Sequence, residues 1–115
     1  MRLVSGSQPI ALEELRALAA GRFGSLVKGV VDLRRELLLL DAELHADQEA
    51  SLLAGGSQQA DLWGINLYPD LDGDQWLEFD SMINLRPSVG NRSRGVENPD
   101  TRAAIAALVS RVVLR

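Results

Sequence analysis

Residues 26–44, LVKGVVDLRRELLLLDAEL, decide the fold because they contain the two most strand-like segments of the chain. Leu26–Leu33 is largely apolar and β-branched, which predicts a β-strand. Residues 32–36 can turn the chain, and Glu36–Leu44 predicts a second strand. Its leucine run, Leu37–Leu40, is continuous rather than alternating, which is typical of a central strand covered on both faces. The stretch therefore predicts an antiparallel hairpin at the centre of a sheet.

A second hairpin is predicted from Asp61–Tyr68 and Trp76–Arg86, which flank a turn region at Pro69–Gln75. Pairing that is symmetrical about Asp72 places Asn66 opposite Glu78 and Gly64 opposite Asp80. Because side chains alternate along a strand, one face of the second strand should turn to the core and the other should be polar. The core face would hold Leu77, Phe79, Ile83 and Leu85. The polar row would hold Asn66, Glu78, Asp80, Asn84 and Arg86.

Three helices complete the predicted fold. Helical spacing of leucines predicts the first over Pro9–Phe23, and Asp47 is expected to cap a short second helix that ends at Gly55. Asn98 should cap the last helix, with Pro99 at its first position. The prediction is a single α+β domain, residues 1–115, with the order α-β-β-α-β-β-α. A four-stranded antiparallel sheet made of two hairpins would carry the helices on one face.

Composition narrows the functional classes. The chain has 115 residues, a formal net charge of -4 and a pI near 4.9, which argues against general nucleic-acid binding. It contains no cysteine, so disulfides and thiolate metal sites are excluded. The opening residues lack the apolar core of a signal peptide, and no apolar run is long enough to span a bilayer. We therefore expect a soluble, cytoplasmic protein without membrane association.

Residues 79–100, FDSMINLRPSVGNRSRGVENPD, concentrate cationic and amide side chains in an otherwise acidic chain. Arg86, Arg92 and Arg94 lie within nine positions, and Asn84 and Asn91 lie beside them. Arginine side chains suit phosphate and carboxylate oxygens, so this loop is a candidate anion-binding site.

An internal role for the same arginines is an equally good interpretation. They would pair with carboxylates of the chain and pin the long loop in place, because long ordered loops are uncommon unless functional or tied down. The candidate partners are Glu43, Glu49, Glu78 and Asp80.

His45, Asp47 and Glu49 form a second candidate cluster. If the chain is extended here, their side chains alternate onto one side, together with Glu43. An imidazole beside carboxylates is a candidate general acid-base group, or a ligand set for a divalent metal that the residues do not specify. The alternative is structural, with Asp47 as a helix cap, Glu49 near the positive end of that helix and His45 at a strand end.

Three strings of the sequence are ELHADQEASLL (43–53), DLWGINLYPD (61–70) and EFDSMINLRPSVGNRSRGVENP (78–99). In these strings the chain resembles the DUF5674 family, an uncharacterised prokaryotic protein family, and the resemblance covers roughly residues 8–114. It implies a small stand-alone prokaryotic protein and supplies no catalytic residues. The polar strings of the family coincide with the candidate site positions.

Two functions from different classes follow. In the first, Arg86, Arg92, Arg94 and Asn84 bind a small anionic, for example phosphorylated, ligand while the His45 cluster moves a proton or holds a metal. In the second, the polar network only stabilises the loop. The protein is then a non-enzymatic interaction module, and the sheet or the last helix mediates formation of a homodimer. The sequence leaves open whether the protein is an enzyme.

Overall fold

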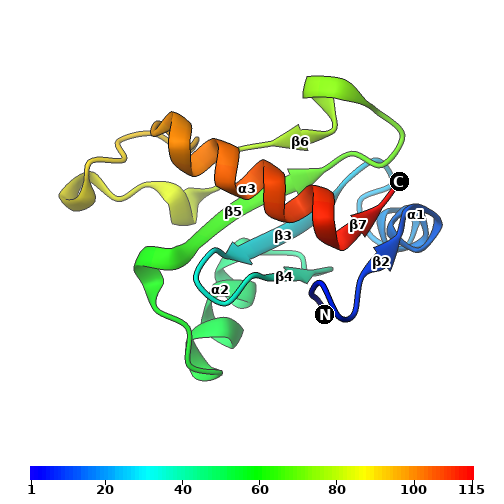
Figure 1. The fold of residues 1–115 in the computed structure, drawn as a ribbon, viewed down its shortest axis with the longest axis horizontal. Helices are drawn as coiled ribbons and strands as arrows, with labels where there is room; N and C mark the ends of the chain where they lie inside the picture. Colours follow the sequence, from blue (N-terminus) through cyan, green and yellow to red (C-terminus); the bar gives the residue numbers. More distant parts are fainter.

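A five-stranded antiparallel sheet in the order β1-β4-β3-β5-β6 forms the centre of the protein, seen in a computed structural model that describes residues 1–115. A separate two-stranded parallel sheet joins β2 to β7, next to the first and last helices (Figure 1). The strands of the central sheet are β1 (Arg2–Val4), β4 (Leu37–Leu40), β3 (Val27–Asp32), β5 (Leu62–Leu67) and β6 (Leu77–Glu78), and those of the small sheet are β2 (Ile10–Ala11) and β7 (Val113–Leu114).

The α+β class is confirmed, but the predicted four-stranded sheet is wrong in detail. Neither β1 nor the pair of β2 and β7 was predicted. Each has only two or three residues, too few to show a period in the sequence. β1 adds to the central sheet by pairing with β4, so that Leu3 lies opposite Leu39.

The three helices lie on both faces of the sheet, which corrects the prediction that they share one face (Figure 1). They are α1 (Leu12–Ala20), α2 (His45–Ala54) and α3 (Pro99–Val112). α1 and α3 pack on the main core, where Leu15 and Ile105 meet Val31 of β3. α2 packs on the other face, where Leu52 contacts a smaller cluster that contains Val30 and Leu39.

The first predicted hairpin is confirmed in β3 and β4, with Val30 opposite Leu39. β3 also pairs with β5, so it is the central strand. In the leucine run Leu38, Leu39 and Leu40 are buried, with Leu39 in the cluster on one face of the sheet and the other two in the cluster on the opposite face, as predicted. β4 ends at Leu40, earlier than the predicted Leu44, because Asp41 adopts a left-handed conformation with φ of 72°.

The second hairpin has the predicted register but a much shorter second strand. Asn66 lies opposite Glu78 and Leu67 opposite Leu77, yet β6 ends there rather than continuing to Arg86. Residues 79–98 instead form an irregular loop with two 3-10 turns, η3 (Met82–Asn84) and η4 (Pro87–Val89).

Gly64 explains why β6 stops. A Cβ at Gly64 would lie 2.4 Å from Cβ of Ser81, so the chain crosses closely over β5 at this point. After the crossing, Ile83 packs with the α2-side cluster, whereas Phe79 packs against the main core. The predicted common core face for these side chains is therefore wrong, and Leu85 is exposed.

The start of α3 agrees with the prediction, whereas the start of α2 does not. α3 begins as predicted, because the Asn98 side chain accepts hydrogen bonds from the amides of Asp100 and Thr101. α2 begins at His45 with Leu44 as its N-cap, so the predicted Asp47 cap is wrong. No helix of the protein is long and apolar enough to cross a membrane.

Candidate functional site

Arg86 has its partners inside the protein. Its guanidinium donates hydrogen bonds to the carbonyls of Ile83 (3.0 Å), Gln59 (2.9 Å) and Leu62. It also lies over the ring of Trp63, 4.7 Å from the centroid. Burial lowers the pKa of Arg86, although Glu49 opposes this effect. Arg86 thus ties the loop to β5 through backbone carbonyls, rather than through the carboxylates that the sequence suggested.

Asn84 and Asn91 are buried and are likewise occupied by backbone groups. The Asn84 side chain accepts from Gly64 N (2.8 Å) and donates to Gly64 O (2.9 Å) and Arg94 O (3.0 Å). The Asn84 side chain thus makes the hydrogen bonds to β5 that a longer β6 would otherwise make. Asn91 donates to the carbonyls of Asn84, Ser93 and Gly95 and accepts from Glu97 N. Both asparagines therefore shape the loop.

Arg92 and Arg94 differ from Arg86 because their guanidinium groups are more exposed. Arg94 Nε donates to Asp80 Oδ1 at 2.7 Å, which is one of the internal ion pairs considered as an alternative to anion binding. The side chain of Arg92 makes no hydrogen bond or ion pair within the chain, and only its backbone amide contacts Glu97.

His45 is the most buried ionisable residue of the predicted clusters, with 8% of its surface exposed. Its Nε2 lies 2.8 Å from the carbonyl oxygen of Ile65, so Nε2 bears the proton and the neutral ring keeps a lone pair on Nδ1. Burial lowers the pKa of His45 below its ordinary value of 6.5, and Lys28 and Arg94 lower it further. The bond to Ile65 and the charge of Asp80 act in the opposite direction.

A cavity of about 140 Å³, which we call the α2 cavity, opens beside His45 at the start of α2. Its polar lining consists of Lys28, Arg94, Ser81 and His45, and it includes no carboxylate. Leu44, Ala46, Met82 and Ile83 complete the wall. Leu44 and Met82 are 56% and 61% exposed, so apolar surface surrounds the opening.

The first turn of α2 adds free backbone donors to this cavity. Leu44, the N-cap, offers no side-chain acceptor, and the amides of His45 and Ala46 make no hydrogen bond within the chain. Unpaired amides at a helix start carry partial positive charge. The α2 cavity therefore combines two cations, an imidazole, a hydroxyl and an uncapped helix start.

A polar row lies on the same face of the sheet as the α2 cavity. Lys28, Asn66 and Glu78 stand side by side on β3, β5 and β6. Asn66 donates to Glu78 Oε1 (2.8 Å) and to the carbonyl of Asp80 (3.2 Å), while its own buried Oδ1 has no partner. Tyr68 donates to Glu78 Oε1 (3.0 Å), and burial and this carboxylate raise the pKa of Tyr68.

Asp47 and Glu49 do not join His45 as predicted, because all three lie on a helix rather than on an extended segment. Asp47 is exposed, whereas Glu49 is half-buried and has an Oε2 atom without a partner. The structure contains no group of three or more His, Cys, Asp or Glu side chains that could hold a metal ion. Of the predicted site residues, His45, Asn66, Glu78, Asp80 and Arg94 lie at or beside the α2 cavity. Asn84, Asn91 and Arg86 form the adjoining network that holds the loop, in which Asn84 bonds to the carbonyl of Arg94. The side chains of Asp47, Glu49 and Arg92 bond to none of these residues.

Comparison with known proteins identifies the family of the chain. The family described as "Protein of unknown function (DUF5674)" matches residues 5–112, nearly the whole chain. The chain belongs to the DUF5674 family. No curated protein and no solved structure matched it.

Three residues of the site were not predicted from the sequence: Lys28, Tyr68 and Ser81. Lys28 is the only lysine of this DUF5674 chain, and it stands in a strand that otherwise consists mainly of apolar residues. An isolated cation in a central strand is a usable signal, because such a charge must reach solvent or a polar cavity. Ser81 has no such signal, since only the crossing over Gly64 brings it to the α2 cavity.

Proposed function

We propose that this protein binds a small anion, or the anionic head group of a larger ligand, in the α2 cavity. One observation supports the proposal above the others: the cavity is lined by Lys28 and Arg94 and by no carboxylate, in a chain of net charge -4. The ligand would carry phosphate or carboxylate oxygens, which accept hydrogen bonds from ammonium, guanidinium and amide groups.

Lys28 is the least compensated cation of this site. Its ammonium group lies 5.3 Å from the centroid of Phe23 and makes no ion pair or hydrogen bond within the chain. The unpaired amides of His45 and Ala46 strengthen the positive potential, since a helix start favours negative charge. Arg94 is partly neutralised by Asp80, which also fixes its direction.

His45 limits the form of the ligand. Its neutral ring offers Nδ1 as an acceptor, because Nε2 donates to Ile65. A bare anion has no proton for this lone pair, whereas a hydroxyl or a protonated phosphate oxygen next to the anionic group has one. The proposed ligand therefore includes a hydrogen-bond donor beside its anionic group, and His45 is the group that could take up its proton.

The size of the cavity supports head-group recognition. A volume of about 140 Å³ is below the several hundred Å³ of sites that enclose a complete drug-sized ligand. A longer ligand would continue across the exposed side chains of Leu44 and Met82 at the opening. An apolar or mixed continuation fits this surface better than a second charged group.

The proposal keeps Arg94 and His45 from the sequence-based hypothesis and replaces Arg86 and Asn84, which serve the loop. The alternative of a homodimer was based on apolar residues that a small domain would leave uncovered. The apolar stripe of α3, represented by Ile105 and Val109, and the leucines of β4 are buried within this chain.

Inorganic phosphate and glycolate, a hydroxyl-bearing carboxylate, are suitable probes in thermal unfolding measurements, with chloride at equal ionic strength as the reference. A ligand at a hundred times its dissociation constant should stabilise the fold by about 2.7 kcal/mol. Lys28→Met should reduce the shift strongly. Arg92→Met is the matched control, since it also removes one positive charge, but from an exposed position that does not line the cavity. An equal response of the two variants, or no response of the wild type, contradicts the proposal.

A further inference from the structure

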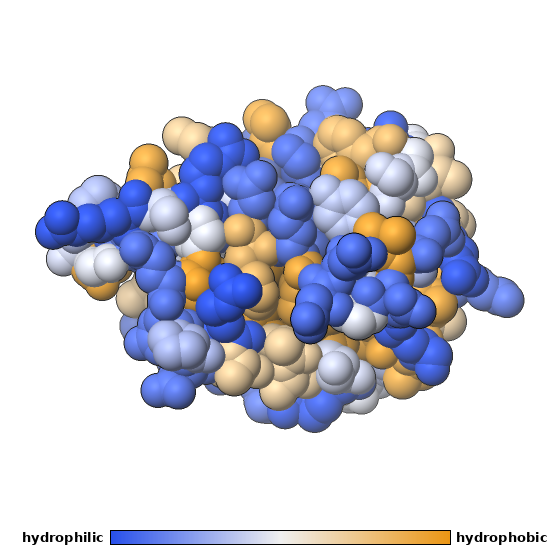
Figure 2. Space-filling model, turned by 90° about the horizontal axis from the view of Figure 1, so that it is seen from above, coloured by the Kyte–Doolittle hydropathy of each residue, from blue (hydrophilic) through white to orange (hydrophobic).

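A second, larger cavity of about 510 Å³ lies between α3 and β6, on the face of the sheet opposite the α2 cavity. We call it the α3–β6 cleft. It exists because α3 presents small residues to β6, among them Ala106 and Ser110, while its bulky residues pack on the middle of the sheet. Figure 2, which looks at the molecule from above the view of Figure 1, shows hydrophobic atoms near the centre of the picture between hydrophilic groups.

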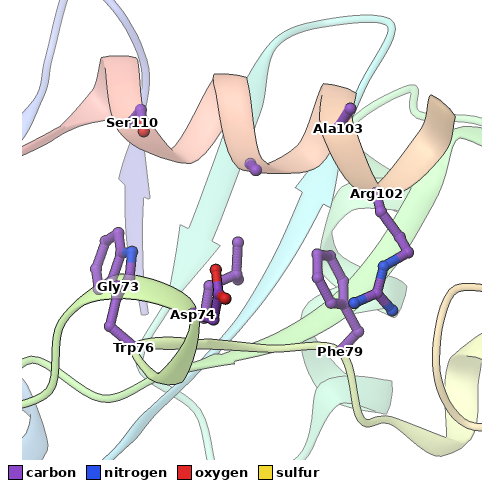
Figure 3. A pocket seen from close by; sticks show the side chains of 9 residues that line it. Gly73, Asp74, Trp76, Phe79, Arg102, Ala103 and Ser110 are labelled. Atoms are coloured by element: carbon purple, nitrogen blue, oxygen red, sulfur yellow. The ribbon is translucent and has the colours of Figure 1, made fainter. Parts of the chain in front are cut away.

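Aromatic rings stand at the two ends of the cleft. Figure 3 shows Trp76 below Ser110 at one end and Phe79 beside Arg102 at the other. Arg102 lies 4.3 Å from the centroid of Phe79, and Arg115 lies 4.3 Å from that of Trp76. These cation–π contacts hold the rings in place. Arg115 does not line the cleft, whereas Trp76 does, so part of the Trp76 side chain faces the cleft away from Arg115.

The polar groups in the cleft have unused hydrogen-bonding capacity. The Asp74 carboxylate makes no hydrogen bond and no ion pair within the chain, and in Figure 3 it lies between the two rings. Arg102 donates one N–H to the carbonyl of Val96 (3.3 Å) and keeps its other donors. The cleft thus offers an acceptor at its middle and a donor at one end.

We propose that the α3–β6 cleft binds a planar heteroaromatic ring that has both a donor edge and an acceptor edge, as guanine has. The ring would stack on Trp76, its amino and ring N–H groups would donate to Asp74, and its carbonyl and ring nitrogen would accept from Arg102. The volume lies within the range of small-molecule sites. The lining combines hydrophobic side chains, among them Trp76 and Phe79, with the polar groups of Asp74, Arg102 and Ser110.

Guanosine is the probe, and titration calorimetry with the full chain measures its affinity. We expect a dissociation constant in the millimolar range or below, together with quenching of Trp76 fluorescence. Inosine, which lacks the 2-amino group, should bind more weakly by about tenfold, as should guanosine to Asp74→Asn, because each change removes a charge-assisted hydrogen bond.

A substitution that fills the cleft distinguishes binding in the cleft from binding elsewhere on the protein. Ala106→Phe should abolish binding because the new ring occupies the cleft, whereas Ala107→Phe, on an exposed position of α3 that does not line it, should not. Thermal unfolding of both variants checks that they are folded, and Asp74→Asn provides the test should Ala106→Phe not fold. No binding of guanosine at millimolar concentration overturns the proposal. The proposal is also overturned if wild type binds guanosine and inosine equally, or if wild type and Asp74→Asn bind guanosine equally.

Discussion

Asn84→Ala is the substitution that best tests whether the arginine–asparagine loop is held from within. Asn84 is fully buried, and its amide group bonds to Gly64 N, Gly64 O and Arg94 O at 2.8–3.0 Å. Alanine removes all three bonds and leaves Gly64 N and Gly64 O without partners, while Arg94 O keeps the bond from the amide of Ser81. No other side chain in the structure bonds to either backbone group of Gly64.

The expected loss follows from the two backbone groups of Gly64 and from the lost bond to Arg94 O. A buried group left without a partner costs about 1–3 kcal/mol, and water that enters the vacated space recovers part of this. We expect Asn84→Ala to lower the free energy of unfolding by about 4 kcal/mol, a large part of the ~5–15 kcal/mol typical of a domain. At about 4 °C per kcal/mol for a chain of this size, Tm should fall by about 15 °C.

Urea unfolding followed by circular dichroism measures this difference, with Gln75→Ala as the control. Gln75 is exposed and makes no side-chain hydrogen bond, so its truncation should change stability by less than about 0.5 kcal/mol. Asn84→Asp gives a second signature. It keeps the acceptor for Gly64 N but places a carboxylate against two carbonyls, which raises its pKa, so this variant should gain stability as pH falls. A loss below about 1 kcal/mol for Asn84→Ala would refute the internal role.

Three further outcomes follow from the structure. Burial lowers the pKa of His45, so the unfolded chain takes up the proton first. Wild type should then lose stability as pH falls from about 6.5 toward the lowered pKa, and His45→Gln should not, as urea unfolding at about pH 7.5 and pH 5 can show. Gly64→Ala should cost about 3 kcal/mol or more, because its Cβ would lie 2.4 Å from Ser81. Gly6→Ala, with nothing within 4 Å, should be nearly neutral in the same unfolding assay. Asn98→Ala should cost about 1 kcal/mol through loss of the α3 cap, and an unchanged urea midpoint would contradict the capping role.

The sheet could be predicted where the apolar pattern alone sets the pairing. The continuous run in β4 and the β-branched residues of β3 require cover on both faces, and the structure provides it. The register of β5 and β6 followed from the symmetry of the turn, since a slip of one residue would expose Leu67 and Leu77. These features depend on the order of apolar and polar residues within neighbouring strands, which can be read directly from the sequence.

The loop and the start of α2 could not be predicted because polar residues occupy buried positions there. Residues 79–86 alternate like a strand, but Ser81 and Asn84 point their polar groups at Gly64 and end the ladder. In α2 the buried residues are His45, Gln48 and Leu52, which do have helical spacing. Two of the three are polar, so a pattern of apolar residues does not reveal where the helix begins.

The candidate site was predicted in part for the same reason. Arg94 and His45 were singled out as chemically capable side chains, and the α2 cavity contains both. Arg86 was equally prominent by type, yet three carbonyls satisfy it. Residue type indicates what a side chain can bind, whereas only the tertiary fold determines whether an internal acceptor reaches it first.

The two roles of the loop are physically linked at Arg94. Its carbonyl accepts hydrogen bonds from the Asn84 side chain and from the amide of Ser81, while its guanidinium pairs with Asp80 and lines the α2 cavity. The bonds that stabilise the loop therefore also position the cation before any ligand arrives. A preorganised cation loses little conformational entropy on binding, so a small anion can be held by few contacts. The proposed site therefore depends on the asparagine network, because that network holds Arg94 in the position from which it lines the α2 cavity.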